Sequence, residues 1–225
     1  MPSFQFIEKL LETPLFQGLS KADLHEIVGR TKFGFSKYDA DRIVVRADGY
    51  CSELLFLLNG TIDISVDSAD HAFTVTERLS APLQIQPHRL FGLNQHYTAT
   101  VRTFTPCNFM TLSKSEVMKL HANYDIFRIN LTNLLATSVQ RYENRLFATP
   151  GDSLRARIVR FFTMHSTHPA GEKIIKIKMN TLAHELNDSR LNVSIELNKL
   201  QSEGLIALSR GLIRIPALER CLLAL

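Results

Sequence analysis

Polar and basic side chains recur between residues 189 and 210, with a spacing that places them on one face of a helix and at a turn beyond it. Ser189, Arg190 and Asn192 open the segment, and Asn198 and Lys199 follow along the same face. Arginine and asparagine hydrogen-bond base edges in the major groove, whereas serine and lysine commonly reach phosphate oxygens. The predicted DNA-contacting set is Ser189, Arg190, Asn192, Ser194, Asn198, Lys199 and Arg210.

Two short helices are predicted to position most of these residues. Asn187 favours the left-handed conformation that ends a helix, and Asp188 or Ser189 is suited to cap the next one. The small side chain of Ala183 lets two helices cross closely. The predicted buried stripes are Leu182, Ala183 and Leu186 in the first helix and Val193, Leu197 and Leu200 in the second.

A β-hairpin is predicted to follow the second helix, which ends at Gly204. Ser209-Arg210-Gly211 forms its turn, and Arg210 and Arg214 are expected near the tip, where a wing meets phosphates. The complete order is typical of a winged helix-turn-helix. An ordinary helix pair and hairpin with solvated charges has the same periodicity and is the alternative.

The charge distribution favours the DNA-binding interpretation. The 225-residue chain carries 26 basic and 22 acidic side chains, and residues 150–225 hold 11 of the basic and 7 of the acidic ones, which leaves 15 of each in residues 1–149. The whole net charge of +4 therefore lies in the segment with the predicted reading helix. A neutral N-terminal part and a basic C-terminal part indicate a sensor joined to a nucleic-acid-binding module.

Several other classes of protein are disfavoured by motifs that the sequence lacks. Cys51, Cys107 and Cys221 are widely spaced with no CxxC pair, so neither a zinc site nor a disulfide framework is indicated. No GxSxG, P-loop or HExxH motif is present, and we predict that the chain is not an enzyme. The N-terminus does not resemble a signal peptide, and no apolar run approaches the roughly 18 residues of a membrane helix. We therefore expect a cytoplasmic protein without a membrane partner.

The first half of the chain predicts a β-rich sensor. After a short helical pattern with Ser20 as N-cap, apolar runs occur at residues 42–46, 53–58, 61–66, 73–79, 99–103 and 108–112. Asp48-Gly49 and Asn59-Gly60 predict turns between them. Many short strands at regular spacing favour an antiparallel roll or barrel. Residues 80–97 contain two prolines and are expected to form a long binding loop.

Helical spacing returns over residues 114–148, where two stripes of different polarity predict a long helix. One stripe could pack on its own domain and the other against a second copy of the chain; a single amphipathic surface helix is the alternative. Thr149-Pro150-Gly151 then predicts a domain boundary, with Asp152 or Ser153 capping the next helix. The predicted domains are residues 1–113, 114–148 and 149–225. The residues singled out on the dimerisation helix are Phe127, Leu131, Leu134, Leu135 and Tyr142.

The chain resembles the catabolite-activator/FNR-type (Crp/Fnr) bacterial transcription regulators over nearly its whole length. The matching segments are PLFQGLS (14–20), ELLFLLNGTIDI (53–64), TATVRT (98–103) and SRLNVSIELNKLQSEGLI (189–206). The resemblance implies an α+β fold with an N-terminal antiparallel β-roll, a long dimerisation helix and a C-terminal winged helix-turn-helix. It also implies a homodimer that binds two-fold-symmetric double-stranded DNA, responds to a small-molecule effector in the roll and contacts RNA polymerase.

The resemblance breaks down where cyclic-nucleotide binders of this family hold their ligand. The family's Gly-Glu pair falls on Pro87-His88, and its phosphate-binding Arg falls on Tyr97. A phenol cannot neutralise a phosphate, and proline removes an amide donor. Cyclic AMP is therefore not the expected effector, and no haem or iron–sulfur cofactor is predicted. The candidate effector-pocket residues are Pro87, His88, Tyr97, Thr98 and Arg102.

The reading helix departs from the family at one position. The resemblance assigns guanine recognition to the first of two arginines, which is Arg190, with a phosphate contact as the alternative. The second arginine is replaced by Ile195, which could touch a thymine methyl group or leave one contact fewer. A module of the same fold that binds a ligand or protein, but no longer binds DNA specifically, remains the alternative function.

Overall fold

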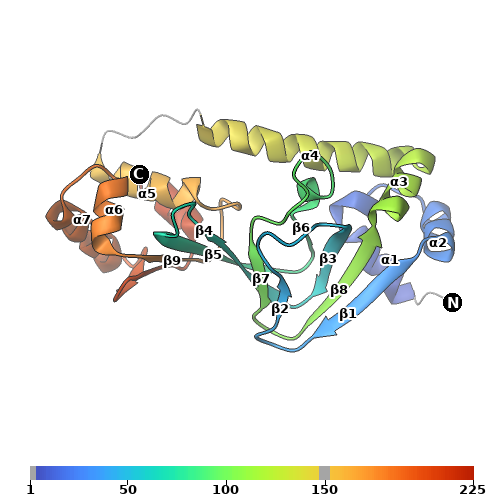
Figure 1. Ribbon diagram of the computed structural model, residues 1–225, viewed down its shortest axis with the longest axis horizontal. Helices are drawn as coiled ribbons and strands as arrows, with labels where there is room; N and C mark the ends of the chain where they lie inside the picture. The colour runs from blue at the N-terminus through green and yellow to red at the C-terminus, as the bar shows by residue number, and fades with distance from the viewer. Residues whose placement is uncertain (1–3, 147–152) are drawn as a thin grey trace. The chain divides into compact units, whose positions relative to one another are not determined.

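A computed structural model describes residues 4–146 and 153–225, and its contacts divide them into two compact units (Figure 1). Among the described residues, unit 1 holds 4–62, 80–98 and 102–146, and unit 2 holds 63–79, 99–101 and 153–225. The internal segment 63–79 thus groups with the C-terminal residues. The predicted boundary at Thr149-Pro150-Gly151 lies outside the described residues.

Unit 1 begins with three short helices. They are α1 (Phe4–Leu11), the 3₁₀ helix η1 (Pro14–Phe16) and α2 (Lys21–Arg30). Ser20 is the N-cap of α2, as predicted, because its hydroxyl accepts a hydrogen bond from the Asp23 amide at 3.0 Å. The apolar side chains of Leu10, Leu15, Phe16, Leu24 and Ile27 are fully buried.

The sheet of unit 1 is antiparallel and has the strand order β1-β8-β3-β6. Its strands are β1 (Phe33–Tyr38), β3 (Glu53–Asn59), β6 (Leu83–Ile85) and β8 (Cys107–Ser113), while β2 (Ile43–Val45) lies in the same unit. The predicted strands 53–58 and 108–112 are confirmed. The expected loop over residues 80–97 is partly wrong, because it contains β6 and the 3₁₀ helix η2 (Pro87–Arg89). Strand β6 is only three residues long and lies between Pro82 and Pro87, so its sequence shows no readable periodicity.

The turn at Asn59-Gly60, which separates β3 from β4 (Thr61–Asp67), requires glycine for two reasons. Gly60 has φ of +100°, a conformation that side chains rarely adopt. A Cβ atom at this position would lie 2.6 Å from both the Cys107 Sγ and the Pro106 carbonyl oxygen. Any larger residue would therefore displace the backbone where the chain leaves the sheet of unit 1.

The predicted continuous helix over residues 114–148 is two helices, α3 (Lys114–Asn123) and α4 (Asp125–Leu146). They are separated by Tyr124, whose extended backbone (φ −128°, ψ 105°) ends α3. The Asp125 carboxylate in the first turn of α4 is favourably placed against the helix dipole and pairs with Arg128 at 2.6 Å. Helical spacing continues across such a break, so periodicity alone does not detect it.

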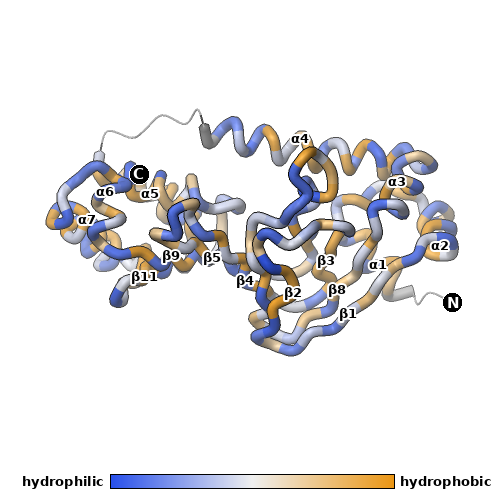
Figure 2. Tube along the Cα trace, viewed as in Figure 1, coloured by the Kyte–Doolittle hydropathy of each residue, from blue (hydrophilic) through white to orange (hydrophobic). Residues whose placement is uncertain are grey.

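The two predicted stripes of α4 have different surroundings. Phe127 and Leu131 are buried within unit 1, and Leu134 and Leu135 are half-buried. Figure 2 shows apolar and polar stretches alternating along the helix. The second stripe is exposed and includes Ile126 and Ile129, which are 40% and 52% accessible. Its members are Ile126, Ile129, Asn133, Ala136 and Gln140.

Unit 2 contains the predicted winged helix-turn-helix together with a hairpin from the middle of the sequence. Its helices are α5 (Leu154–Met164), α6 (Met179–Glu185), α7 (Arg190–Ser202) and α8 (Leu218–Leu223). Its strands include most of β4 (Thr61–Asp67) and of β5 (Phe73–Ser80), together with β9 (Lys173–Ile177), β10 (Ala207–Ser209) and β11 (Leu212–Ile215). The short strand β7 (Thr100–Thr103) contributes its first two residues. The hydrogen-bonded order in unit 2 is β10-β11-β9-β5-β4.

The β4–β5 hairpin is an integral part of the core of unit 2. Strand β5 pairs antiparallel with β9, so that Val75 faces Ile175 and Glu77 faces Lys173. Phe73 is buried with its ring 5.3 Å from that of Phe161 in α5. Each fully buried side chain of this size stabilises the unit by about 1.5–3 kcal/mol. The hairpin therefore shares the hydrophobic core of the helix-turn-helix.

None of the described helices is long and apolar enough to cross a membrane.

Candidate nucleic-acid interface

The predicted DNA-contacting residues lie at the start and on the outward face of α7 and in the turn of the wing, which is the β10–β11 hairpin. Val193, Leu197 and Leu200 are fully buried, which fixes the opposite face of α7 toward solvent. Arg190, Asn192, Asn198 and Lys199 are exposed and Ser194 is half-exposed. Helices α6 and α7 lie side by side at one end of unit 2 (Figure 1). Such a rod with a polar outer face has the dimensions to enter a major groove.

The start of α7 is fixed by local interactions that the sequence anticipated. Asn187 adopts the left-handed conformation with φ of +48°. Ser189 is the N-cap, and its hydroxyl accepts a hydrogen bond from the Asn192 amide at 3.1 Å. Arg190 is consequently the first residue of α7, at the end that a recognition helix presents to bases.

Arg157 of α5 holds this turn and was not recognised from the sequence. Its guanidinium donates to the Leu186 carbonyl oxygen at 2.6 Å and to the Asp188 carboxylate at 2.5 Å. The carboxylate also accepts from the Asn192 side chain at 2.9 Å, so part of the hydrogen-bonding capacity of Asn192 is already used. Hydrogen bonds from Asn192, Ser189 and Arg157 lower the pKa of Asp188. No local pattern identifies Arg157, because its partners are about thirty residues away.

Only some basic groups of unit 2 are free to bind phosphate. Among the described residues, no acidic group pairs with Arg190 or Arg210, and both are exposed. Lys199 pairs with Glu196 at 3.1 Å. Arg214 was expected near the wing tip, but it lies within β11 and pairs with Glu172 at 2.9 Å, so this expectation is wrong. Gly211, with φ of +70°, shapes the turn that carries Arg210.

Two apolar side chains share the outer face of α7 with these polar groups. Leu191 and Ile195 are 69% and 48% accessible. They are four residues apart and therefore adjacent on the helix surface. Together they form an apolar surface suited to contact thymine methyl groups. Ile195 was recognised from the sequence as a candidate contact, whereas Leu191 was not.

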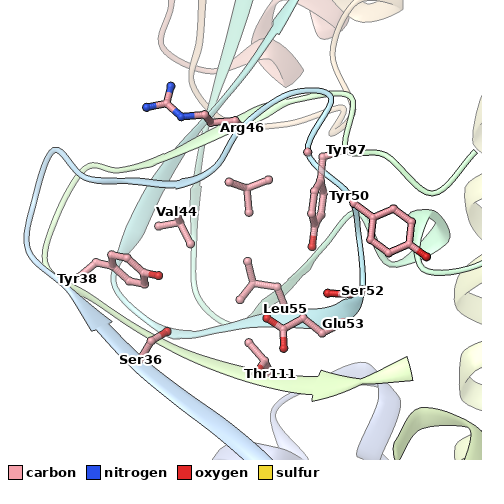
Figure 3. A pocket seen from close by; sticks show the side chains of 12 residues that line it. Ser36, Tyr38, Val44, Arg46, Tyr50, Ser52, Glu53, Leu55, Tyr97 and Thr111 are labelled. Atoms are coloured by element: carbon pink, nitrogen blue, oxygen red, sulfur yellow. The ribbon is translucent and has the colours of Figure 1, made fainter. Parts of the chain in front are cut away.

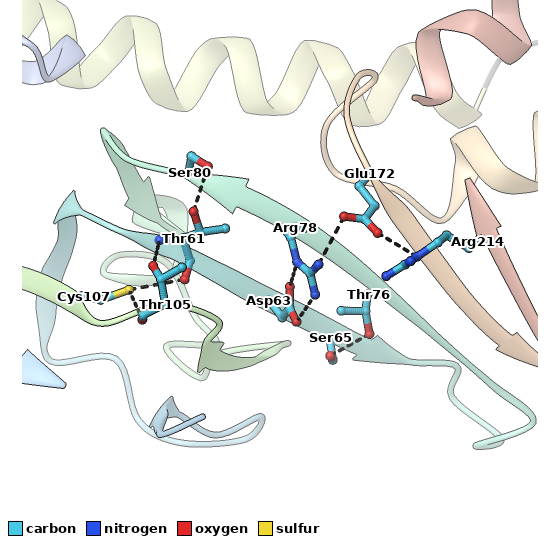
Figure 4. A network of polar contacts seen from close by, with 10 residues as sticks. All are labelled: Thr61, Asp63, Ser65, Thr76, Arg78, Ser80, Thr105, Cys107, Glu172 and Arg214. Atoms are coloured by element: carbon cyan, nitrogen blue, oxygen red, sulfur yellow. Dashed lines mark hydrogen bonds and ion pairs between the residues drawn. The ribbon is translucent and has the colours of Figure 1, made fainter. Parts of the chain in front are cut away.

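A network of ion pairs ties the wing to the β4–β5 hairpin (Figure 4). Arg78 of β5 donates two hydrogen bonds to the Asp63 carboxylate of β4, at 2.8 and 2.9 Å. It also lies 3.3 Å from Glu172, which in turn pairs with Arg214 of β11. The side chains of Asp63, Arg78 and Glu172 are partly shielded from solvent, and Arg78 binds Asp63 in a bidentate manner, so this part of the network adds rigidity to the sheet of unit 2.

The five candidate effector residues do not converge on one site. Pro87 is buried in η2, which contacts α4, and the His88 ring lies edge-on to Tyr142 with centroids 6.1 Å apart. Burial lowers the pKa of the His88 imidazole. Arg102 is exposed and pairs with Asp41 at 2.9 Å, while Thr98 bonds the Gln86 amide. Tyr97 is buried and lines a cavity in unit 1 whose lining does not include the other four residues (Figure 3).

The cysteines and histidines form no reactive or metal-binding cluster in the described part of the chain. Cys51, Cys107 and Cys221 are buried free thiols. Burial raises the pKa of the Cys107 and Cys221 thiols, so they stay protonated and weakly nucleophilic. The described residues contain no group of three or more side chains arranged to hold a metal ion.

Comparison with known proteins supports the same architecture. No family model matches the sequence, and no curated protein matches it either. Among solved structures, the Catabolite Activator Protein of Thermus thermophilus is 17% identical, with a TM-score of 0.50 over 94% of this chain and 99% of that one. A protein from Eubacterium rectale assigned to the crp/fnr regulators is 20% identical, with a TM-score of 0.50 over 93% and 96%. The sensor domain of the regulator DNR from Pseudomonas aeruginosa is 16% identical, with a TM-score of 0.51 over 66% and 96%.

At these identities the similarity concerns the fold, and it extends over both units. The alignments with the Thermus thermophilus and Eubacterium rectale proteins cover 94% and 93% of this chain, so they include residues of both units. The chain therefore has the catabolite-activator/FNR-type (Crp/Fnr) fold.

Proposed function

We propose that this chain is a transcription regulator that binds double-stranded DNA through α7 and the wing. The observation that carries the proposal is the outward face of α7, where Arg190 stands free at the first helical position beside exposed polar and apolar side chains. The free Arg210 in the turn of the wing supplies a second, phosphate-binding contact.

We propose further that the chain acts as a homodimer through α4. Ile126, Ile129, Asn133, Ala136 and Gln140 recur at alternating spacings of three and four residues, which is the pattern of a helix seam. Phe127 and Leu131 already pack within unit 1, so the exposed stripe is the one available to a second copy. Two recognition helices related by a two-fold axis would read a palindromic operator.

The proposal can be tested by selecting binding sites from random duplex DNA and measuring affinity by fluorescence anisotropy. We expect binding that weakens steeply as salt rises, because phosphate contacts release counterions. Arg190→Ala should weaken binding to the selected site by about 5- to 150-fold, corresponding to roughly 1–3 kcal/mol at one base step. Lys37→Ala, at an exposed position of β1, removes the same charge far from α7 in sequence and serves as the control.

The outcomes separate the alternatives. Equal losses of affinity for selected and for random DNA in Arg190→Ala would show that Arg190 contacts the phosphate backbone. Failure to enrich any sequence, together with salt-insensitive weak binding, would favour a ligand- or protein-binding module of the same fold that no longer recognises DNA.

A further inference from the structure

A cavity of about 300 Å³ lies within unit 1, between β1, β2, β3 and β8 (Figure 3). It differs from the predicted effector pocket, because Tyr97 is the only residue that the two sets share. A volume near the lower end of the range for ligand pockets suits a small molecule. Nothing assigned to the DNA-binding surface accounts for this cavity.

The polar groups that face the cavity are hydrogen-bond acceptors and hydroxyls with a single charge among them. Figure 3 shows the Glu53 carboxylate and the hydroxyls of Ser36 and Tyr38 directed into the cavity. The Tyr97 hydroxyl enters from the opposite wall. No described residue donates a hydrogen bond to the half-buried Glu53 carboxylate or forms an ion pair with it. A negative charge is therefore available to a ligand.

Neither Arg46 nor the tyrosines at the cavity compensate the negative charge of Glu53. The guanidinium of Arg46 points away from the centre of the cavity (Figure 3). Tyr50 is exposed, and its hydroxyl donates to the Gln95 side chain at 2.8 Å. Burial raises the pKa of the Tyr97 phenol, helped by Cys51 and by the nearby Glu53 charge, so this phenol stays neutral. The interior of the cavity thus carries a net negative charge.

The remaining wall is apolar and aromatic. Val44, Val45 and Leu55 line the cavity, and the rings of Tyr38 and Tyr97 lie on opposite sides of the space. Phenol rings attract cations through their π faces, and the attraction grows when the cation is shielded from water. A carboxylate beside two phenol rings and a short aliphatic wall complements a cation with an apolar stem.

We propose that this cavity binds a small organic ammonium ion, with the charged nitrogen at Glu53 and its carbon chain against Val44 and Leu55. The ammonium group would donate hydrogen bonds to the Glu53 carboxylate and the Tyr38 hydroxyl. The proposal goes beyond DNA binding and does not depend on it, because the site lies entirely in unit 1.

The test compares three ligands of nearly equal shape and different charge. n-Butylammonium, n-butanol and butyrate are titrated into the full-length protein without DNA, using calorimetry and intrinsic tyrosine fluorescence. The chain has no tryptophan, and three of its five tyrosines line the cavity, so the fluorescence reports on this site. We expect saturable binding of butylammonium at least about tenfold tighter than that of butanol, and no binding of butyrate.

Substitutions at Glu53 and Arg46 then test which charged side chain binds butylammonium. Glu53→Gln preserves the shape of the side chain and should weaken butylammonium binding about tenfold to a hundredfold while leaving butanol binding unchanged. Arg46→Gln, whose side chain points away, should not weaken it. Absence of butylammonium binding to the wild-type protein would overturn the proposal without any variant. Equal binding of the three ligands, or full retention of affinity in a folded Glu53→Gln protein, would also overturn it.

Discussion

Replacing Glu77 by glutamine should destabilise unit 2 more than any single surface change. Glu77 lies in β5 and is only 3% exposed, directly opposite Lys173 of β9, which is fully buried. The Lys173 ammonium is 3.1 Å from the Glu77 carboxylate and donates to the Ala170 carbonyl oxygen at 2.7 Å. The carboxylate also accepts hydrogen bonds from the backbone amides of Thr167 and His168.

The magnitude follows from the pKa of Glu77. Burial by itself raises this pKa, but the hydrogen bonds from His168 and Thr167 and the charge of Lys173 outweigh burial and hold it at about 2, compared with 4.5 for an ordinary glutamate. Since one pKa unit corresponds to about 1.4 kcal/mol, the ionised carboxylate contributes about 3 kcal/mol to the free energy of unfolding. The folded pKa is the lower one, so this contribution is complete above the unfolded pKa. It is lost as the pH falls from about 4.5 toward 2.

Glu77→Gln should therefore cost about 3–5 kcal/mol at pH 7, because it leaves a buried ammonium without a counter-charge. Urea unfolding followed by circular dichroism gives the total change in the free energy of unfolding. Amide hydrogen exchange in α5 and β9 isolates unit 2, where protection should fall about a hundredfold or more. Glu185→Gln, at an exposed position of α6, is the matched control and should stay within about 0.5 kcal/mol of wild type.

Two further comparisons test the reasoning itself. Adding Lys173→Met to Glu77→Gln should recover much of the lost stability, because the pair is then replaced by groups without charge. The difference between wild type and Glu77→Gln should shrink as the pH falls toward 2. A Glu77→Gln protein as stable as wild type at pH 7, or a difference that is the same at pH 7 and pH 3, would refute the argument from the buried ion pair.

Two other predictions concern the helix-turn-helix and the helix seam. Arg157→Met removes the hydrogen bonds to the Leu186 carbonyl and Asp188, so it should cost about 1–3 kcal/mol in urea unfolding and weaken DNA binding in anisotropy, whereas the exposed Lys176→Met should do neither. Full DNA affinity in Arg157→Met would show that the turn between α6 and α7 keeps its conformation without Arg157. Ile129→Glu places a charge on the exposed stripe of α4 and should convert a dimer to a monomer in analytical ultracentrifugation, and Leu93→Glu, also at an exposed apolar position, should not. An unchanged sedimentation coefficient in Ile129→Glu would exclude this stripe as the interface.

The sequence alone predicted the helix-turn-helix closely because its determinants are local. The left-handed Asn187, the Ser189 cap and the buried stripe at Val193, Leu197 and Leu200 act within one or two helical turns. Local propensity and periodicity therefore agree with the tertiary structure, and the N-cap of α2 at Ser20 follows the same rule.

Elements with weak local signals were missed or merged. The three-residue strand β6 is too short to show alternation, and β1 was not predicted although it pairs with β8 over its whole length. The break at Tyr124 between α3 and α4 was hidden by helical spacing that continues on both sides. In each case pairing or packing with distant residues decides the conformation.

Which distant segments meet, by contrast, can be seen only in the folded chain. Glu77 and Lys173 are ordinary charged residues in the sequence, and each would be expected at the surface. Antiparallel pairing of β5 with β9 buries both and makes the hairpin part of the helix-turn-helix core. The cavity around Glu53 likewise depends on strands from four separate stretches. Caps and stripes are properties of neighbouring residues, whereas burial and cavities arise only when remote strands come together.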